Sequence, residues 1–179
     1  MSIYRVWIFR VLVAVSASLA IVSFIGPWWS AIITSELVTP GISSFVVNIY
    51  QWGIPESPGS EHFITDVTPF YQTVLAYIFL AASIGFIFFS TLLKGRKGKW
   101  LLGSIGLIWI GYAAIAAIWI AIRTGDYGIS LQGVSLIQQP GEAEITASLR
   151  FGYYLAYVVG VMCIGLALIR DRITGTELK

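Results

Sequence analysis

The chain has 179 residues, of which 57% are hydrophobic and 11% are charged. Soluble domains contain about 25% charged residues, and a chain of this size cannot bury so much apolar surface in one water-soluble core. The net charge is only +2 and no basic tail is present, which argues against a nucleic-acid-binding protein. We therefore expect a single integral membrane domain over residues 1–179, with the lipid bilayer as a partner and no nucleic acid.

Four apolar segments are long enough to cross a bilayer, which takes about 20 residues in a helix. Lipid cannot satisfy open backbone groups, so such segments must be helical. Arg5 and Arg10 followed by an apolar run are also typical of a secretory signal peptide, but we expect this segment to stay as the first helix. The predicted helices span about 8–29, 68–93, 100–122 and 151–170, joined by outer loops at 30–67 and 123–150 and a cytoplasmic loop at 94–99.

The sequence GPWWSA, at residues 26–31, closes the first apolar segment. Tryptophan prefers the boundary between membrane and water, where its ring is dry and its N–H is wet. Pro27 has no backbone N–H and interrupts a helix. We expect Trp28 and Trp29 to mark the outer end of the first helix.

Charged residues are divided unequally between the two sides of the predicted helices. The side of the termini and the 94–99 loop carries nine basic and two acidic residues, whereas the other side carries two basic and seven acidic residues. Basic residues are retained on the cytoplasmic side of membrane proteins. The sequence therefore predicts a multi-pass protein of the cell membrane with both termini in the cytoplasm.

The second outer loop has the pattern of a β-hairpin. Apolar and polar residues alternate within 128–139 and again within 142–150, and period two indicates half-buried strands. Pro140-Gly141 between them is a turn signal, and Gly133 suggests a bulge.

The first outer loop is also rich in residues that favour strands. Residues 35–54 contain many valine, isoleucine, threonine and aromatic residues, divided into two runs by Pro40-Gly41. A lone hairpin is marginally stable in water, so we expect both loops to build one sheet, with Trp52 packed under or within it. The predicted fold class is a membrane all-α protein with a small β part. It is a four-transmembrane-helix bundle topped by a small antiparallel extracytoplasmic β-sheet that both outer loops form.

Groups that carry chemistry are scarce. No ionisable residue is expected within a helix core, which argues against a pump, transporter or channel formed by this chain alone. His62 is the single histidine and lies between Glu61 and Asp66; these residues suit a metal site or an enzyme using His62, but they also fit a solvated acidic loop, which we favour. Cys163 is expected to be a buried packing residue. We predict no catalysis, no cofactor and no metal.

Aromatic residues repeat at helical spacing in the third predicted helix. Trp109, Tyr112 and Trp119 lie near one face, and this face suits a quinone or lipid pocket. Core packing or lipid contact is the commoner role of such a stripe.

Pairs of small residues four apart let helices approach closely in lipid. The pattern favours packing within the bundle and leaves oligomerisation open. The pairs are Ala14/Ser18, Ser16/Ala20, Ala81/Gly85 and Ala113/Ala117.

The whole arrangement resembles the claudins and their peripheral-myelin-protein-like relatives. In that comparison Trp28 or Trp29 matches the first loop tryptophan of claudins, and Gln51-Trp52-Gly53 loosely matches their Gly-Leu-Trp group. The cysteine pair of the claudin loop is missing, and the spacing of the tryptophans is longer. The resemblance implies a sheet of both loops over a left-handed bundle and a role in adhesion or lateral assembly.

We predict a non-catalytic protein that acts in structural assembly through its outer loops, with other membrane subunits or copies of itself as partners. The alternative is a small accessory subunit of a respiratory, redox or transport complex, which stabilises neighbouring subunits or lines a quinone or lipid site. The predicted partner or lipid contacts are Trp28, Trp29, Trp52, Trp109, Tyr112 and Trp119.

Overall fold

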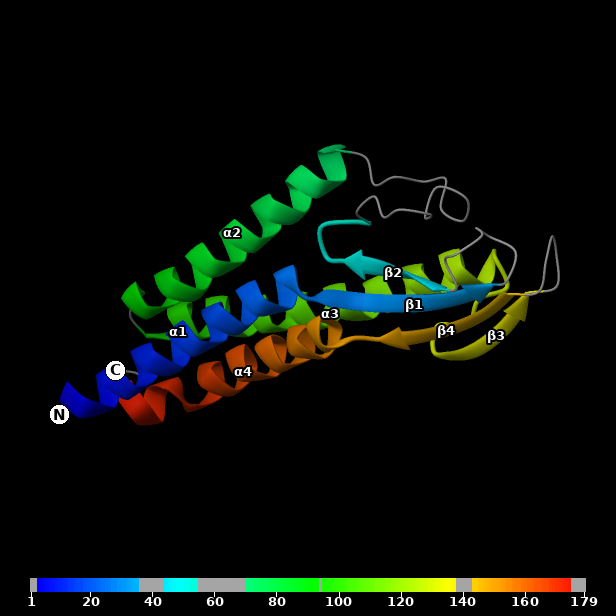
Figure 1. Ribbon diagram of the computed structural model, residues 1–179. Helices are drawn as coiled ribbons and strands as arrows, with labels where there is room; N and C mark the ends of the chain where they lie inside the picture. Colours follow the sequence, from blue (N-terminus) through cyan, green and yellow to red (C-terminus); the bar gives the residue numbers. More distant parts are fainter. Residues whose placement is uncertain (1–2, 36–43, 55–69, 94, 138–142, 175–179) are drawn as a thin grey trace.

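The computed structural model describes residues 3–35, 44–54, 70–93, 95–137 and 143–174. Four of its helices are long and apolar enough to cross a membrane. In Figure 1 the helices form an elongated bundle with the sheet at one end, and the start of α1 and the end of α4 lie at the other end. The elements are α1 (Ile3–Ile25), β1 (Pro27–Ser35), β2 (Ser44–Tyr50), α2 (Phe70–Leu92), α3 (Arg96–Gly125), β3 (Gly133–Ile137), β4 (Ala143–Leu149) and α4 (Phe151–Thr174).

The four predicted helices are present, but some of their ends differ from those expected. Helix α1 ends at Ile25 instead of residue 29, because the chain passes at Pro27 directly into a strand. Helix α3 is longer at both ends than the predicted 100–122, and runs from Arg96 to Gly125. Helix α4 continues to Thr174, beyond the predicted end at residue 170.

The strands form one antiparallel sheet in the order β2-β1-β4-β3. Segments from both predicted loops pair at its centre, where β1 and β4 run from Trp29 opposite Leu149 to Ser35 opposite Ala143. This confirms the prediction of a single antiparallel sheet built from both loops. Because β1 follows α1 and β4 precedes α4 almost without a connection, the central strands extend the two helices and hold the sheet on the bundle.

Several details of the sheet differ from the sequence analysis. Strand β1 begins at Pro27, well before the run of strand-forming residues expected from residue 35. Strand β3 begins at Gly133 instead of residue 128 and pairs with β4 in regular register, so the predicted bulge at Gly133 is wrong. The alternation within β4 is confirmed, since Ala143, Ile145 and Ala147 are buried. The predicted Pro140-Gly141 turn lies outside the described residues.

Close packing of backbone fixes the places where helices and strands cross. Ser23 Oγ donates a hydrogen bond to the carbonyl of Gly152 over 2.7 Å, and Trp28 Nε1 donates to the carbonyl of Ser23 over 2.9 Å. A Cβ atom added at Gly152 would lie 2.6 Å from the carbonyl oxygen of Gly26. The α1–β1 and β4–α4 junctions therefore touch through their backbones.

The predicted small-residue pairs lie in different surroundings. Ser16 and Ala20 of α1 are buried, and so is Ala113 of α3, as packing within the bundle requires. Ala81 and Gly85 of α2 are exposed. One pair thus faces away from the bundle.

The expectation that no ionisable residue lies within a helix core is corrected at Arg170. Its side chain is buried near the bundle end away from the sheet, where it donates to the backbone carbonyl of Leu93 and lies 5.8 Å from the ring centroid of Phe9. Gly98 of α3 makes room for the guanidinium, which an added Cβ would overlap. Because α4 extends past residue 170, Arg170 belongs to the bundle and joins its four helices.

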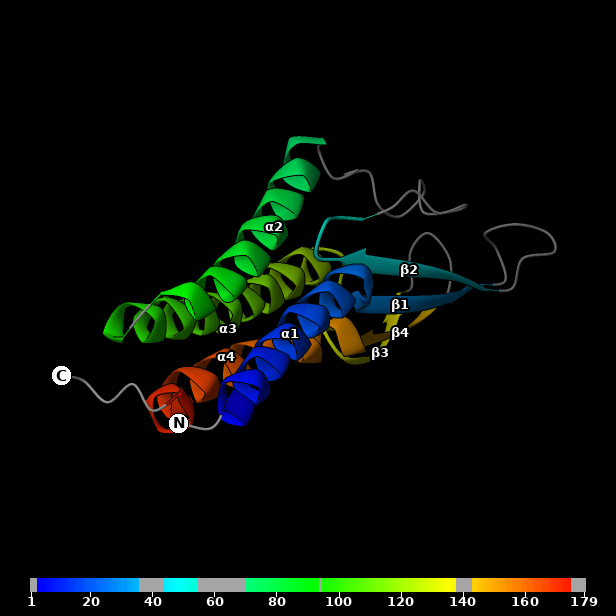
Figure 2. The same ribbon diagram turned by 90° about the vertical axis from the view of Figure 1, so that its left-hand side faces the viewer.

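Helix α2 separates from the other helices toward its first residue, as both ribbon views show (Figure 2). Its buried residues are Ser83, Ile87 and Ser90, all in its second half. The first two turns of α2 therefore lie apart from the bundle core and leave space beside α3 and the sheet, whereas Phe79 and Leu80 already pack against the core.

Candidate functional site

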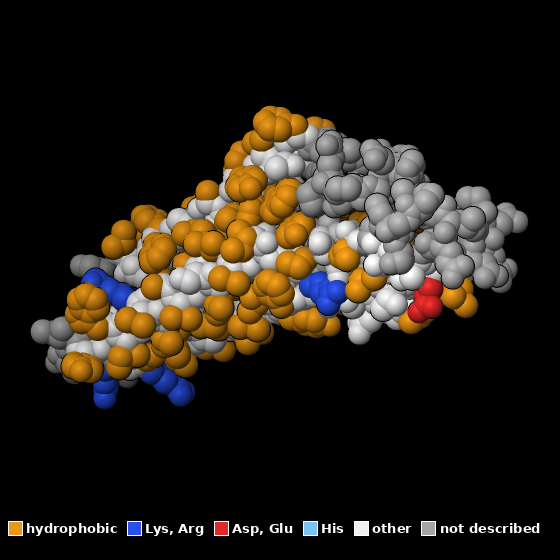
Figure 3. All heavy atoms as spheres, in the orientation of Figure 1, with side chains coloured by type: hydrophobic (Ala, Val, Ile, Leu, Met, Phe, Trp, Pro, Cys, Tyr) orange, Lys and Arg blue, Asp and Glu red, His pale blue; other side chains and the backbone are white. Residues whose placement is uncertain are grey.

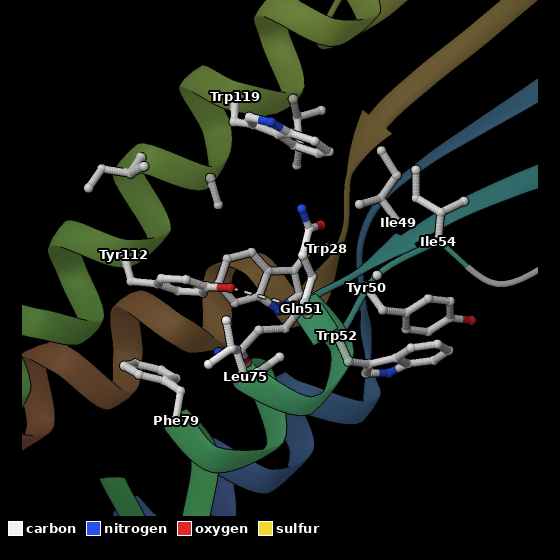
Figure 4. A pocket seen from close by; sticks show the side chains of 16 residues that line it. Trp28, Ile49, Tyr50, Gln51, Trp52, Ile54, Leu75, Phe79, Tyr112 and Trp119 are labelled. Carbon is white, nitrogen blue, oxygen red and sulfur yellow. Dashed lines mark hydrogen bonds between the residues drawn. The ribbon is translucent and has the colours of Figure 1, made fainter. Parts of the chain in front are cut away.

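A cavity of about 460 Å³ lies between the first half of α2, the second half of α3 and the turn that follows β2 (Figure 4). Its volume falls within the range of about 300–1,000 Å³ that small-molecule sites occupy. Four residues singled out in the sequence meet there although they come from three separate segments. They are Trp28, Trp52, Tyr112 and Trp119.

The turn after β2 forms one wall of the cavity. The backbone N–H of Tyr50 donates to the carbonyl of Gly53 over 2.9 Å, and the reverse bond is 3.2 Å. Gly53 has φ 137, a conformation that favours glycine. Thr73 Oγ1 donates to the carbonyl of Trp52 over 3.0 Å and so ties the turn to α2. The turn is held from both sides, so the Gln51 between its ends has a defined position.

Aromatic rings form the deep wall. Trp28 is fully buried, and its ring meets that of Tyr112 edge-on with centroids 5.6 Å apart. Phe79 of α2 stacks on Tyr112 with centroids 5.0 Å apart. Aromatic pairs of these geometries stabilise each other by about 0.5–1.5 kcal/mol. The wall is therefore rigid and offers flat apolar surface.

Gln51 is the polar feature of this wall. The residue is only 7% exposed, and neither amide atom has a hydrogen bond of ordinary length and angle within the described part of the chain, although the amide lies near the Tyr112 side chain. Figure 4 shows the amide in the space between the rings of Tyr112 and Trp119. The Tyr112 hydroxyl donates instead to the backbone carbonyl of Gln51, over 3.5 Å. A buried amide without partners destabilises the folded chain by about 1–3 kcal/mol, unless another molecule hydrogen-bonds to it.

The lining carries no charged side chain among its sixteen residues. Arg123 lies next to the rim, with its guanidinium carbon 5.8 Å from the ring centroid of Trp119. No group of three or more metal-binding side chains occurs among the described residues, and the Glu61, His62 and Asp66 of the predicted alternative lie outside them. Cys163 is buried in the helical core, as expected.

Two of the predicted contact residues lie elsewhere. Trp109 is fully buried in the helical core, and Trp29 is buried under the sheet, where its Nε1 donates to the carbonyl of Leu131 over 2.8 Å. Neither ring lines the cavity, and the predicted contact of lipid or a partner with them stays a prediction. Trp28 is also buried. It was predicted to mark the outer end of the first helix, but it lies in β1, because α1 already ends at Ile25. Trp52 lies beside the sheet, stacked on Tyr50 with centroids 5.0 Å apart.

Neither the role of Gln51 nor the participation of α2 in the cavity was predicted from the sequence. The signal at Gln51 is a lone polar residue between strand-forming and turn residues, within the Gln-Trp-Gly match. Leu75 and Phe79 carry no signal of their own in an apolar helix.

The face of the sheet that points away from α3 carries a second feature. Ile32 pairs with Val46 on one side and with Thr146 on the other, and Thr146 pairs with Val134. These side chains form a row across all four strands. Val134 is 59% exposed, and Leu136 beside it on the edge strand β3 is 74% exposed. Exposed apolar groups that cluster in this way mark interaction surfaces.

No family model matches the chain, and no curated protein is similar to it at a significant level.

Proposed function

We propose that the chain is a multi-pass protein of the cell membrane that acts without catalysis, by binding another membrane protein or a second copy of itself through its sheet. The support for membrane insertion is the four long apolar helices, whose exposed sides are covered by hydrophobic groups in Figure 3. Exposed apolar surface of this extent supports contact with lipid.

The proposed orientation places the sheet outside the cell and both termini in the cytoplasm. The support is the position of the charges: in Figure 3 most lysine and arginine side chains lie at the bundle end away from the sheet, a further basic group lies where the helices meet the sheet, and an acidic group lies at the sheet end. Lys99 and Asp171 form an ion pair of 3.4 Å near the same basic end. Basic residues stay on the cytoplasmic side.

The observation that carries the proposed interaction is the apolar row on the outward face of the sheet, which Val46, Ile32, Thr146 and Val134 form, with Leu136 beside it opposite Glu144. It ends on β3, which has a neighbour on one side only among the described strands. An edge strand with exposed apolar side chains can accept a strand from a partner. A claudin-like role in lateral assembly is the form of this function that we propose.

Photo-crosslinking in the native membrane tests this function. A photoreactive phenylalanine analogue is placed at Leu136 and, as a matched control, at Leu107, which is equally prominent on α3 at 65% exposure. The proposal expects a discrete adduct with one protein from position 136 and none from position 107. Absence of a protein adduct from positions 136, 134 and 46 alike would contradict it.

A further inference from the structure

We infer that the cavity between α2, α3 and the β2 turn binds an uncharged, membrane-soluble ring compound of the quinone class, whose ring oxygen hydrogen-bonds to the Gln51 amide. This site goes beyond the interaction role proposed above and does not depend on it, because it lies on the opposite side of the sheet from the apolar row. Among the described residues of the cavity wall, the Gln51 amide is the buried polar group without a hydrogen-bond partner of ordinary geometry.

The Gln51 side chain determines what kind of polar group fits. A primary amide has two donor hydrogens and an oxygen that accepts. It can therefore donate to the carbonyl of a quinone and equally accept from the hydroxyl of the reduced quinol. Both amide atoms are buried and free of partners among the described residues, so a ligand oxygen at this point would relieve the cost of burying them.

The absence of charge in the lining determines the electrical character of the ligand. All sixteen lining residues are uncharged, and placing an ion beside apolar walls without a countercharge is costly. Among the described residues that line the cavity, none carries a charge that would pair with a carboxylate, an ammonium group or a phosphate. The head of the ligand is therefore neutral.

The shape of the walls favours a flat ring. The rings of Trp28, Tyr112 and Trp119 surround the space into which the Gln51 amide points (Figure 4). Phe79 stacks behind Tyr112 and keeps that ring in place. Aromatic side chains bind flat rings by stacking and edge-on contact. A flexible acyl chain has no ring and cannot form these contacts.

The mouth of the cavity suits an apolar tail. Leu75 of α2 and Ile115 of α3 both line the cavity and are exposed, at 59% and 68%. They stand on the two helices that diverge at this level (Figure 2). In the proposed membrane orientation the gap between these helices faces the bilayer, so a lipid-soluble tail leaves between them while the ring stays inside.

Binding of decylubiquinone to the purified full-length chain tests the inference. The chain is placed in phosphatidylcholine nanodiscs, and quenching of tryptophan fluorescence is titrated. Gln51→Leu keeps the side-chain size and is expected to weaken binding about tenfold, the loss of one neutral hydrogen bond. Ala76→Phe, which fills the cavity from α2, is expected to abolish saturable binding.

Matched controls are available in the same chain. Gln132→Leu changes an exposed glutamine outside the cavity, and Ala81→Phe adds the same ring on the exposed side of α2. Both controls are expected to bind within about twofold of the original chain. Helical content by circular dichroism shows whether each variant is folded, and Gln51→Leu tests the polar contact if Ala76→Phe fails to fold.

Two results would overturn the inference. One is equal quenching of the original chain, Gln51→Leu and Ala76→Phe, which means that the quinone only partitions into the lipid. The other is a phospholipid that copurifies with the chain, is lost in Ala76→Phe and is not displaced by decylubiquinone, as native mass spectrometry would record. A saturable site that weakens in Gln51→Leu but not in Gln132→Leu supports it, whether or not the sheet binds a partner.

Discussion

Gly106 and Gly160 are predicted to tolerate no larger residue where the backbones of α3 and α4 face each other. A Cβ atom added at Gly106 would lie 2.6 Å from the carbonyl oxygen of Gly160 and 3.0 Å from the backbone nitrogen of Ile164. Both atoms belong to the facing backbone and cannot rotate away. Gly106→Ala must therefore push the two helices apart, at a cost of about 1–3 kcal/mol typical of overpacking.

Gly103, on the same helix, is the matched control. A Cβ atom there would meet only the Cβ of Ala167, at an ordinary 3.7 Å. Alanine also favours a helix over glycine by about 1 kcal/mol, so Gly103→Ala is expected to be neutral or stabilising. Both substitutions gain the same helix propensity, so their difference in stability reflects overpacking alone. Gly106→Ala should therefore be less stable than Gly103→Ala by about 2 kcal/mol.

Reversible unfolding in mixed micelles, followed by circular dichroism as SDS is added, measures the difference. The midpoint for Gly106→Ala is expected at a lower SDS fraction than that for Gly103→Ala, with Gly160→Ala resembling the former. Equal midpoints for Gly106→Ala and Gly103→Ala would refute the close approach of α3 and α4.

Three further substitutions test other parts of the structure by the same unfolding measurement. Gln51→Leu removes a buried amide without partners among the described residues and is expected to stabilise the chain by about 1–3 kcal/mol in detergent free of added lipid; a destabilised variant would contradict its burial. Arg170→Ala removes the buried group that joins the helices and is expected to cost about 2–4 kcal/mol, whereas Arg172→Ala, at an exposed position, should change stability by less than about 0.5 kcal/mol; similar effects would contradict the buried position. Trp28→Phe leaves the carbonyl of Ser23 without its donor and is expected to cost about 1–3 kcal/mol, a loss absent if the indole bond does not form.

The sequence predicted the helices and the shared sheet because both depend on local patterns. Long uncharged runs require helices in lipid, and the alternation at 143–149 required a strand with one buried side. The early start of β1 was missed because Ile32 breaks its alternation of apolar and polar residues. Adjacent tryptophans such as Trp28 and Trp29 are common both at the membrane interface and in strands, and the sequence alone did not distinguish the two.

The site could be predicted only in part, because it depends on the relative positions of distant segments. Tyr112 and Trp119 were identified from helical spacing, but their meeting with Trp28 and Trp52 follows from the divergence of α2, which no local pattern determines. Trp109 has the same spacing and yet faces the core, because α3 is packed on more than one side. The burial of Arg170 likewise depends on the space left by Gly98 on another helix.

The measurement that tests the proposed function most directly is native mass spectrometry of the protein extracted in mild detergent from its own membrane. The proposal predicts a complex with a second copy or with another membrane protein, and predicts that Leu136→Glu, which places a charge on the apolar row, returns the chain to its single mass of 19.6 kDa. A chain that appears alone in both forms, or a complex that Leu136→Glu leaves intact, would contradict binding through the sheet.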